Sequence, residues 1–124
     1  MDLENQLVLI VEDEFLIAMD LAETVREAGA DVVGPAASVN EALDLLSSHR
    51  ITVAVLDVNL GKEQSLAVAE RLTGDQIPFV YHTGQKALLG TSSWPEAPVI
   101  SKPAIPSVFV AMIADAAAKR SDQL

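Results

Sequence analysis

The stretch that decides the fold is Ile51-Thr-Val-Ala-Val-Leu-Asp-Val-Asn-Leu-Gly61. It is a short apolar run rich in β-branched residues, and it ends at the carboxylate of Asp57 before Asn59 and Gly61 break the pattern. A run of this length between turn-forming residues predicts a strand buried on both faces. A charged residue can end such a strand only where it emerges at the edge of the sheet, where ligands bind in α/β folds. Asp57 is therefore the first candidate functional residue.

Apolar runs of the same kind recur along the chain, with helical patterns between them. We predict strands over residues 6–11, 31–37, 51–57, 77–83 and 98–101. We predict helices that end near Ala28 and Gly74, one that opens with the capping box Ser38-Val-Asn-Glu41, a short one over 85–91 and a last one over 106–119. Gly29 is expected to end the first helix, and Pro35 is expected to place its strand at an edge of the sheet.

Five alternations of strand and helix call for a parallel sheet covered on both faces. With right-handed crossovers, the expected fold is an α/β, three-layer, doubly wound domain. The 124 residues show no linker, internal repeat or low-complexity segment, so we expect one domain over residues 1–124.

The composition excludes several function classes. A net charge of −10 with only eight scattered basic residues argues against direct binding to nucleic acid, which needs clustered Lys and Arg. No apolar run approaches the roughly 20 residues that span a bilayer, and no secretory signal opens the chain, so we expect a cytoplasmic protein without a membrane partner. The absence of cysteine excludes disulfides, thiolate metal sites and cysteine nucleophiles.

Polar residues stand at the ends of four of the five predicted strands. They are Glu12 and Asp13 after the first strand, Asp57 on the third, Thr83 on the fourth and Lys102 after the fifth. Each has an ordinary explanation when taken singly; Asp13 or Glu14, for example, could cap the first helix. Because all carboxyl ends of a parallel sheet lie at one edge, their convergence by accident is improbable.

The chemistry of these residues is compatible with one site. Carboxylates this close raise one another's pKa unless a cation relieves them. Oxygen ligands without His or Cys suit a hard ion such as Mg²⁺. Asp57 could then act as a nucleophile toward phosphorus, with Lys102 and Thr83 contacting phosphoryl oxygens.

The motifs Val-Glu-Asp-Glu, Val-Leu-Asp-Val-Asn-Leu, His-Thr-Gly and Ser-Lys-Pro, taken in this order, resemble those of the receiver domain of bacterial two-component response regulators. The resemblance covers the whole chain. It implies a (βα)5 CheY-like (flavodoxin-like) fold with strand order 2-1-3-4-5. It implies a Mg²⁺-dependent phosphoacceptor that serves a sensor histidine kinase or phosphotransfer protein, and not an enzyme acting on other substrates.

The resemblance also assigns roles. Asp57 would accept phosphate, while Asp13 and Asp57 directly, Glu12 through water and the Asn59 carbonyl would bind Mg²⁺. Lys102 would pair with the phosphoryl group, Thr83 would move onto it to signal, and the bond from Lys102 to Pro103 is often cis in the family.

The chain departs from the family pattern in two places. Many receivers carry Tyr or Phe three residues before the lysine, whereas here the residue is Val99, so that aromatic switch is missing. Pro78 to Gln85 resembles a divergent form of the Phe-Ala-Thr-Gly-Tyr signature of a receiver subgroup common in alphaproteobacteria, with His82 and Gln85 replacing two of its residues. We interpret His82 as a core histidine rather than a phosphoryl carrier.

The last helix is unusually apolar. One stripe is formed by Phe109, Met112 and Ala116, and another by Val110, Ile113, Ala114 and Ala117. An ordinary surface helix has one such stripe, so we expect a homodimer or effector interface formed by the fourth helix, fifth strand and fifth helix. The alternative is an alanine-rich helix with a tolerable exposed face.

Two other functions compete with the phosphorylated switch. A pseudo-receiver that binds partners without phosphate is favoured by Val99 and opposed by the intact acidic residues, Thr83 and Lys102. A small phosphatase with an aspartyl-phosphate intermediate is disfavoured, because the position two residues after Asp57 is Asn59 rather than an acid or base.

Overall fold

Five strands build one parallel sheet in the computed structural model, which describes residues 2–84, 89–90 and 93–123. The strands are β1 (Leu7–Val11), β2 (Asp31–Ala36), β3 (Val53–Leu56), β6 (Phe79–Thr83) and β7 (Val99–Ser101). Their order is β2-β1-β3-β6-β7, which is the predicted order 2-1-3-4-5 when these five are counted along the chain. The α/β fold class is confirmed.

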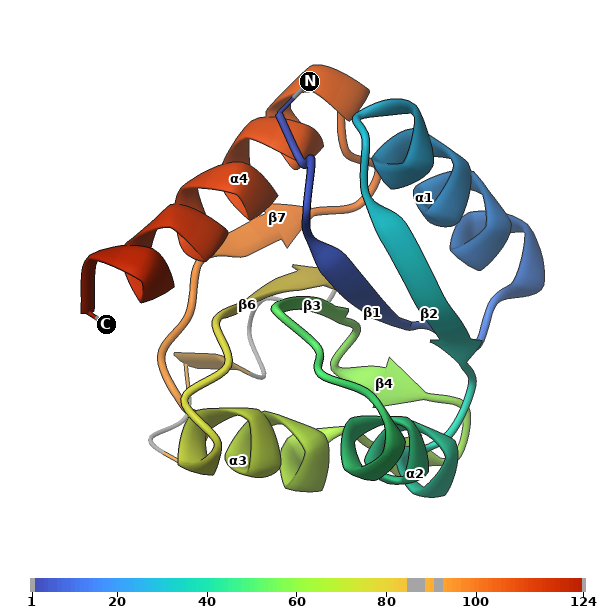
Figure 1. Cartoon of the computed structure of the whole chain (residues 1–124). Coiled ribbons are helices and arrows are strands. Elements are labelled where there is room, and N and C mark those ends of the chain that lie inside the picture. The colour runs from blue at the N-terminus through green and yellow to red at the C-terminus, as the bar shows by residue number, and fades with distance from the viewer. Residues whose placement is uncertain (1, 85–88, 91–92, 124) are drawn as a thin grey trace.

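Helices cover both faces of the sheet. They are α1 (Phe15–Glu27), α2 (Val39–Ser48), α3 (Leu66–Gly74) and α4 (Pro106–Gln123). Figure 1 shows α1 and α4 on one face and α2 and α3 on the other, so the three predicted layers are confirmed. Of the short helix predicted over 85–91, residues 85–88 and 91 lie outside the described residues.

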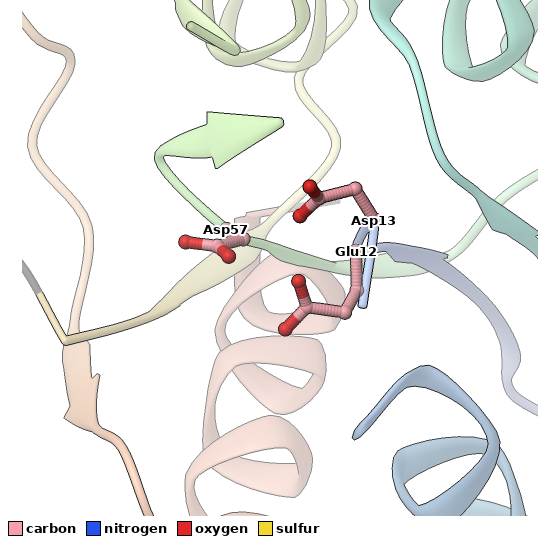
Figure 2. A group of neighbouring side chains, drawn as sticks. All are labelled: Glu12, Asp13 and Asp57. Atoms are coloured by element: carbon pink, nitrogen blue, oxygen red, sulfur yellow. The ribbon is translucent and has the colours of Figure 1, made fainter. Parts of the chain in front are cut away.

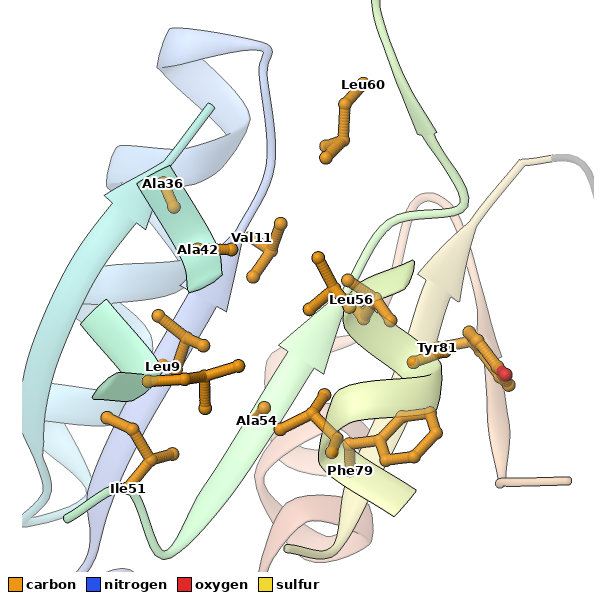
Figure 3. Packing of buried hydrophobic residues seen from close by; sticks show 14 of the residues in the cluster. Leu9, Val11, Ala36, Ala42, Ile51, Ala54, Leu56, Leu60, Phe79 and Tyr81 are labelled. Atoms are coloured by element: carbon orange, nitrogen blue, oxygen red, sulfur yellow. The ribbon is translucent and has the colours of Figure 1, made fainter. Parts of the chain in front are cut away.

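Two apolar clusters fill the spaces between the sheet and its helices. Alternate residues of a strand face opposite sides, so Leu9 and Val11 of β1 pack toward α2 and α3, while Val8 and Ile10 pack toward α1 and α4. Figure 3 shows the first cluster, in which the ring of Phe79 lies near the central strands. Both clusters include residues of β1 and β3, so these two strands are packed on both faces and their carboxyl ends are held in place.

The edge strand β2 depends on a glycine. Gly34 has a φ of 97°, and a Cβ at this position would lie 2.8 Å from the Ala36 nitrogen and 2.9 Å from the Ile10 oxygen. A side chain therefore cannot be accommodated without moving backbone. Pro35 follows on the outermost strand, as predicted, where its missing N–H costs no ladder bond.

The helix ends also follow the sequence signals. Gly29 has a φ of 103° just after α1, and Ser38 Oγ accepts a hydrogen bond from the Glu41 nitrogen at 3.2 Å. Among the residues that the structure describes, none belongs to a helix long and apolar enough to cross a bilayer.

A small hairpin follows the central strand, where Asn59 and Gly61 break the apolar pattern. β4 (Asn59–Leu60) and β5 (Glu63–Gln64) pair antiparallel around a two-residue turn. Gly61, with a φ of 67°, supplies the positive φ that such a tight turn needs at its first central position. The hairpin is held to the second helix, because the Val39 nitrogen donates a hydrogen bond to Glu63 Oε2 at 3.3 Å.

The buried face of the last helix does not coincide with either of the two apolar stripes that the sequence suggested. The buried face of α4 combines members of both stripes: Phe109, Ile113, Ala116 and Ala117. The remaining Val110, Met112 and Ala114 are half-buried and pack against the same cluster. The spacing i, i+4, i+7, i+8 of the buried residues is that of one ordinary helix face, so the helix has less surplus apolar surface than the sequence indicated.

Candidate phosphoryl and metal site

The register of the central strands brings the first acidic residues together. Val11 of β1 pairs with Leu56 of β3, and the Asp57 nitrogen donates a hydrogen bond to the Val11 oxygen at 3.0 Å. The residues that follow the two strands therefore leave the sheet side by side. These residues are Glu12 and Asp57, and both are buried.

Three carboxylates form one group at this edge. Glu12, Asp13 and Asp57 each place an oxygen within 4.8 Å of the others. Figure 2 shows Asp13 and Glu12 reaching toward Asp57 from the end of β1. The donor set consists of oxygens alone, which fits a hard divalent ion such as Mg²⁺. Asp13 is exposed, so an ion bound here could keep water ligands on that side.

Lys102 compensates much of this negative charge. It follows β7, and its Nζ lies 2.7 Å from Asp57 Oδ2 and 2.6 Å from Glu12 Oε1. The lysine side chain is 18% exposed, so both ion pairs are largely shielded from solvent. The peptide bond between Lys102 and Pro103 is cis, as the family resemblance implied.

Burial and charge shift the pKa of two of these groups. Burial raises the pKa of Glu12 to about 7; the hydrogen bond from Lys102 opposes the rise and the neighbouring Asp57 adds to it. For Lys102, burial lowers the pKa, but hydrogen bonds to Asp57 and Glu12 outweigh burial and the net shift is upward. Glu12 is thus a carboxyl group that a nearby divalent cation would help to ionise.

Asp13 and Asp57 border a polar cavity of about 550 Å³, which is also lined by Asn59, Gly61, Thr83 and Lys102. Every residue predicted for the site therefore lines this cavity except Glu12. Glu12 lies behind the lining and forms an ion pair with Lys102. A Cβ on Gly61 would lie 3.6 Å from Asp13 Oδ2, an ordinary contact. Thr83 is buried, and its backbone carbonyl oxygen accepts a hydrogen bond from the backbone nitrogen of Lys102 at 3.2 Å.

Ser65 is a positioning residue whose role the sequence analysis missed. It is fully buried, and its Oγ donates a hydrogen bond to the backbone carbonyl oxygen of Asp57 at 2.6 Å and lies 3.2 Å from the backbone carbonyl oxygen of Val58. These bonds tie the loop after β3 to the start of α3. The available signal was a serine directly before the apolar run from Leu66, a typical helix-capping position, although Ser65 makes no side-chain cap bond here.

Three neighbouring residues test the sequence interpretations, and His82 agrees with its interpretation whereas Glu14 does not. His82 is buried against the ring of Phe109, with ring centroids 5.5 Å apart, so it is a core histidine. Val99 is half-buried and packs against the first apolar cluster. Glu14 stands at the N-cap of α1 without a side-chain cap bond, so capping does not explain it.

Comparison with known proteins agrees with this geometry. The family model described as the response regulator receiver domain matches residues 8–94. The phyllosphere-induced regulator PhyR of Methylorubrum extorquens is 35% identical over 113 residues, which cover 88% of this chain and 42% of that protein. The transcriptional regulatory protein PdtaR of Mycobacterium tuberculosis is 39% identical over 77 residues, which cover 61% of this chain and 38% of that protein.

The fold has a solved counterpart of similar size. The solution structure of the PhyR response regulator receiver domain from Erythrobacter litoralis superimposes with a TM-score of 0.83 at 28% identity, covering 91% of this chain and 90% of that one. The chain spans less than half the length of the two curated relatives. On the match over residues 8–94 and on the shared fold, this chain belongs to the response regulator receiver domain family.

Proposed function

We propose that the domain is a Mg²⁺-dependent phosphoacceptor in which Asp57 takes phosphate from a sensor histidine kinase or a phosphotransfer protein. One observation carries the proposal. The Asp57 carboxylate, at the end of the central strand, shares a polar cavity with further acidic groups and contacts Lys102 at 2.7 Å. We extend this proposal to the whole chain, residues 1–124, as one receiver domain in the cytoplasm.

Glu12, Asp13 and Asp57 would hold the ion, with the Asn59 carbonyl completing the protein ligands. Bound there, Mg²⁺ would neutralise carboxylate charge and orient phosphoryl oxygens. The raised pKa of Glu12 supports this assignment, because the site as it stands favours a proton on one of its carboxyls and a divalent ion could take the place of that proton.

The protein's own residues would divide the transfer between them. An Asp57 carboxylate oxygen forms the new bond to phosphorus while the bond from phosphorus to the donor histidine nitrogen breaks. Lys102, already beside Asp57, would pair with the phosphoryl oxygens, and the Thr83 hydroxyl would donate to them. Movement of Thr83 would then carry the signal away from the site.

PhyR and PdtaR, the two relatives described above, are both named as regulators, which supports a regulatory role rather than turnover of an external substrate. We propose that output passes to an effector or to a second copy of the chain through β7, α4 and the segment between β6 and β7. Val108 supports this assignment, because it is an exposed apolar residue near the start of α4.

A second candidate is a partner-binding module that works without phosphate. Val99 favours it, because the half-buried valine cannot act as the aromatic switch found in many receivers. The acidic group and Lys102 would then serve only to hold the loops.

Beryllofluoride, a phosphoryl mimic, separates the two candidates. With Mg²⁺ and beryllofluoride, amide resonances around the polar cavity should shift in a saturable way, and Asp57→Asn protein should not respond. The matched control is Asp75→Asn, since Asp75 pairs with Arg71 on the surface away from the cavity. Absence of any response in the parent protein would favour the phosphate-independent module.

A further inference from the structure

The edge of the sheet where the strands begin contains a cavity of about 520 Å³. Gln6 directly precedes β1, Thr52 directly precedes β3 and Ile77 lies two residues before β6, and all three line the cavity together with the C-terminal part of α4. This volume lies within the range of pockets that bind small molecules. Asp57 stands at the opposite ends of the strands, so the phosphoryl chemistry proposed above makes no use of this cavity.

This cavity carries positive charge although the chain is strongly acidic. The net charge is −10 and only eight residues are Lys or Arg, yet Arg50 and Arg120 both line the cavity, together with His49. The carboxylate in its lining, Asp75, is already paired, because Arg71 Nε donates a hydrogen bond to Asp75 Oδ2 at 2.7 Å. The charge left uncompensated is therefore positive, which makes this a basic cavity.

Arg120 is held at the basic cavity by a bond outside its own helix. Its Nη1 donates a hydrogen bond to the backbone carbonyl oxygen of Ile51 at 3.3 Å, and the residue is half-buried. A guanidinium group has five N–H donors in a planar fork, and this bond uses one of them. The group is thus oriented in advance and has further donors for a second partner.

Compensation of helix dipoles explains only part of this charge. Basic residues near helix C-termini commonly oppose the partial negative charge there, and Arg71 in the last turn of α3 is such a residue. Arg50 lies beyond the C-cap of α2 and is exposed, and within the described part of the chain it forms no ion pair and no side-chain hydrogen bond. Arg50 and Arg120 therefore offer two guanidinium groups to one cavity without a carboxylate that neutralises them.

The chemistry of the wall selects the type of occupant. Arginine binds phosphate and carboxylate oxygens through two parallel N–H groups, and two arginines match an anion with two charges. A phosphate monoester is such an anion near neutral pH, because its second pKa is about 6. Ile77 is half-buried and Ala117 is buried in the same wall, so the cavity also offers apolar surface to the body of the ester.

We propose that the basic cavity binds a small phosphate monoester, whose phosphate contacts Arg50 and Arg120 and whose apolar body lies against Ile77. The site is separate from Asp57 and needs neither Mg²⁺ nor phosphoryl transfer. Its failure and the failure of the proposed function can therefore be told apart.

The test is an NMR titration of isotope-labelled protein with phenyl phosphate, benzoate and phenol as probes. It is done without Mg²⁺ in low-salt buffer at about pH 7.5, where the ester is a dianion. Phenyl phosphate should produce saturable shifts in the amides of residues 49–52 and in the side-chain Nε groups of both arginines. Benzoate, with a single charge, should bind about tenfold more weakly, and phenol should cause no shifts at these residues. Added salt should weaken the binding of phenyl phosphate, and Asp57→Asn should not change it.

Charge-matched substitutions locate the binding. Arg50→Gln should weaken the binding of phenyl phosphate about tenfold, and the double variant R50Q/R120Q should abolish it. Arg26→Gln is the matched control, because Arg26 is exposed in the last turn of α1, carries the same charge and does not line the cavity. This control should bind phenyl phosphate as tightly as the parent. Arg50 is exposed, so its substitution should leave the fold intact, and the amide spectrum of the free variant checks this.

Three results would overturn the proposal. The first is the absence of any saturable shift at residues 49–52 with phenyl phosphate. The second is an equal loss of affinity in Arg26→Gln and Arg50→Gln, which would reduce the effect to overall charge. The third is binding of benzoate or phenol as tight as that of phenyl phosphate, which would show that the cavity does not select a dianion.

Discussion

The polar cavity beside Asp57 and the apolar cavity beside His82 are nearly equal in volume, about 550 and 580 Å³, and they share Lys102 as a wall. The two cavities differ in whether the polar groups buried beside them have partners. Beside Asp57, opposite charges lie within 2.7 Å of each other and compensate locally. Beside His82, a neutral ring is buried without a partner in the described fold. One lysine therefore borders both a cavity that contains ion pairs and a cavity lined largely by apolar side chains.

The largest effect expected on this comparison comes from Asp57→Asn. An amide cannot form the acyl phosphate, so incorporation of phosphate from a small phosphodonor should fall to background. Intact-protein mass spectrometry before and after incubation measures it. Continued labelling of the variant at another residue would show that Asp57 is not the phosphoacceptor.

Lys102→Ala should affect both cavities. Removing the cation leaves Glu12 and Asp57 buried without their partner, so in Mg²⁺-free buffer the free energy of unfolding should fall by about 3 kcal/mol. Some phosphorylation of Asp57 should remain, with a weaker conformational response. Urea unfolding gives the first quantity, and the amide shifts with beryllofluoride give the second.

Lys119→Ala is the control for the charge change. Lys119 pairs with Asp115 on the exposed surface, and such pairs contribute roughly 0–1 kcal/mol. Equal losses of stability in the two lysine variants would show that Lys102 stabilises the fold no more than an exposed ion pair does.

Lowering the pH should change the stability in opposite directions through Glu12 and through His82, because burial raises the pKa of one group and lowers that of the other. The folded pKa of Glu12 is about 7 against 4.5 in the unfolded chain, so its contribution to stability is present below pH 4.5 and is lost as the pH rises through 7. The folded pKa of His82 is about 4 against 6.5, so its contribution is present above pH 6.5 and is lost as the pH falls through 4.

Single substitutions should reveal these opposing contributions to the free energy of unfolding, each on the order of 3 kcal/mol across its full pH range. Between pH 7 and pH 4, Glu12→Gln should lose stability more steeply than the parent in Mg²⁺-free buffer, and His82→Phe less steeply. Urea unfolding across this pH range is the measurement. Parallel curves for the parent and both variants would show that neither group titrates as its burial implies.

The smallest effect is the stabilisation by Mg²⁺. At a concentration about five times its dissociation constant, the ion should add about 1 kcal/mol to the free energy of unfolding. The gain should be larger at pH 8 than at pH 5.5, because a proton on Glu12 competes with the metal. Asp13→Asn should reduce the gain, and Asp20→Asn in the apolar cavity should not. An equal gain in both variants would place the ion outside the acidic group.

Much of the fold could be predicted from residue patterns because each pattern has one geometric solution. The spacing of Ala18, Leu21, Ala22 and Val25 fits only a helix with one buried face, and all four are buried. The position of Asp57 after a doubly buried strand predicted where the acidic group would gather. The assignment of roles to these residues remains a prediction, as does the likeness of residues 78–85 to a receiver subgroup.

Other features depend on distances that the sequence does not contain. The β4–β5 hairpin arises from a short pairing around Gly61, which in the sequence is merely a turn signal. The sequence could not decide which face of the last helix is buried, because an almost wholly apolar helix has several equivalent faces and the positions of β3 and β6 select one. The unpartnered state of His82 likewise depends on what every neighbouring element places near its ring.

Trp94 is a half-buried residue that packs against the first apolar cluster, next to strand β6. It is the only tryptophan in the chain, and its ring meets Tyr81 edge to face, with centroids 6.1 Å apart. Tyr81 lies in β6 two residues before Thr83, and its hydroxyl donates to the Pro95 oxygen at 2.6 Å. Any displacement of β6 would therefore alter the surroundings of a single natural fluorophore, whose emission offers a label-free optical record of the strand's motion.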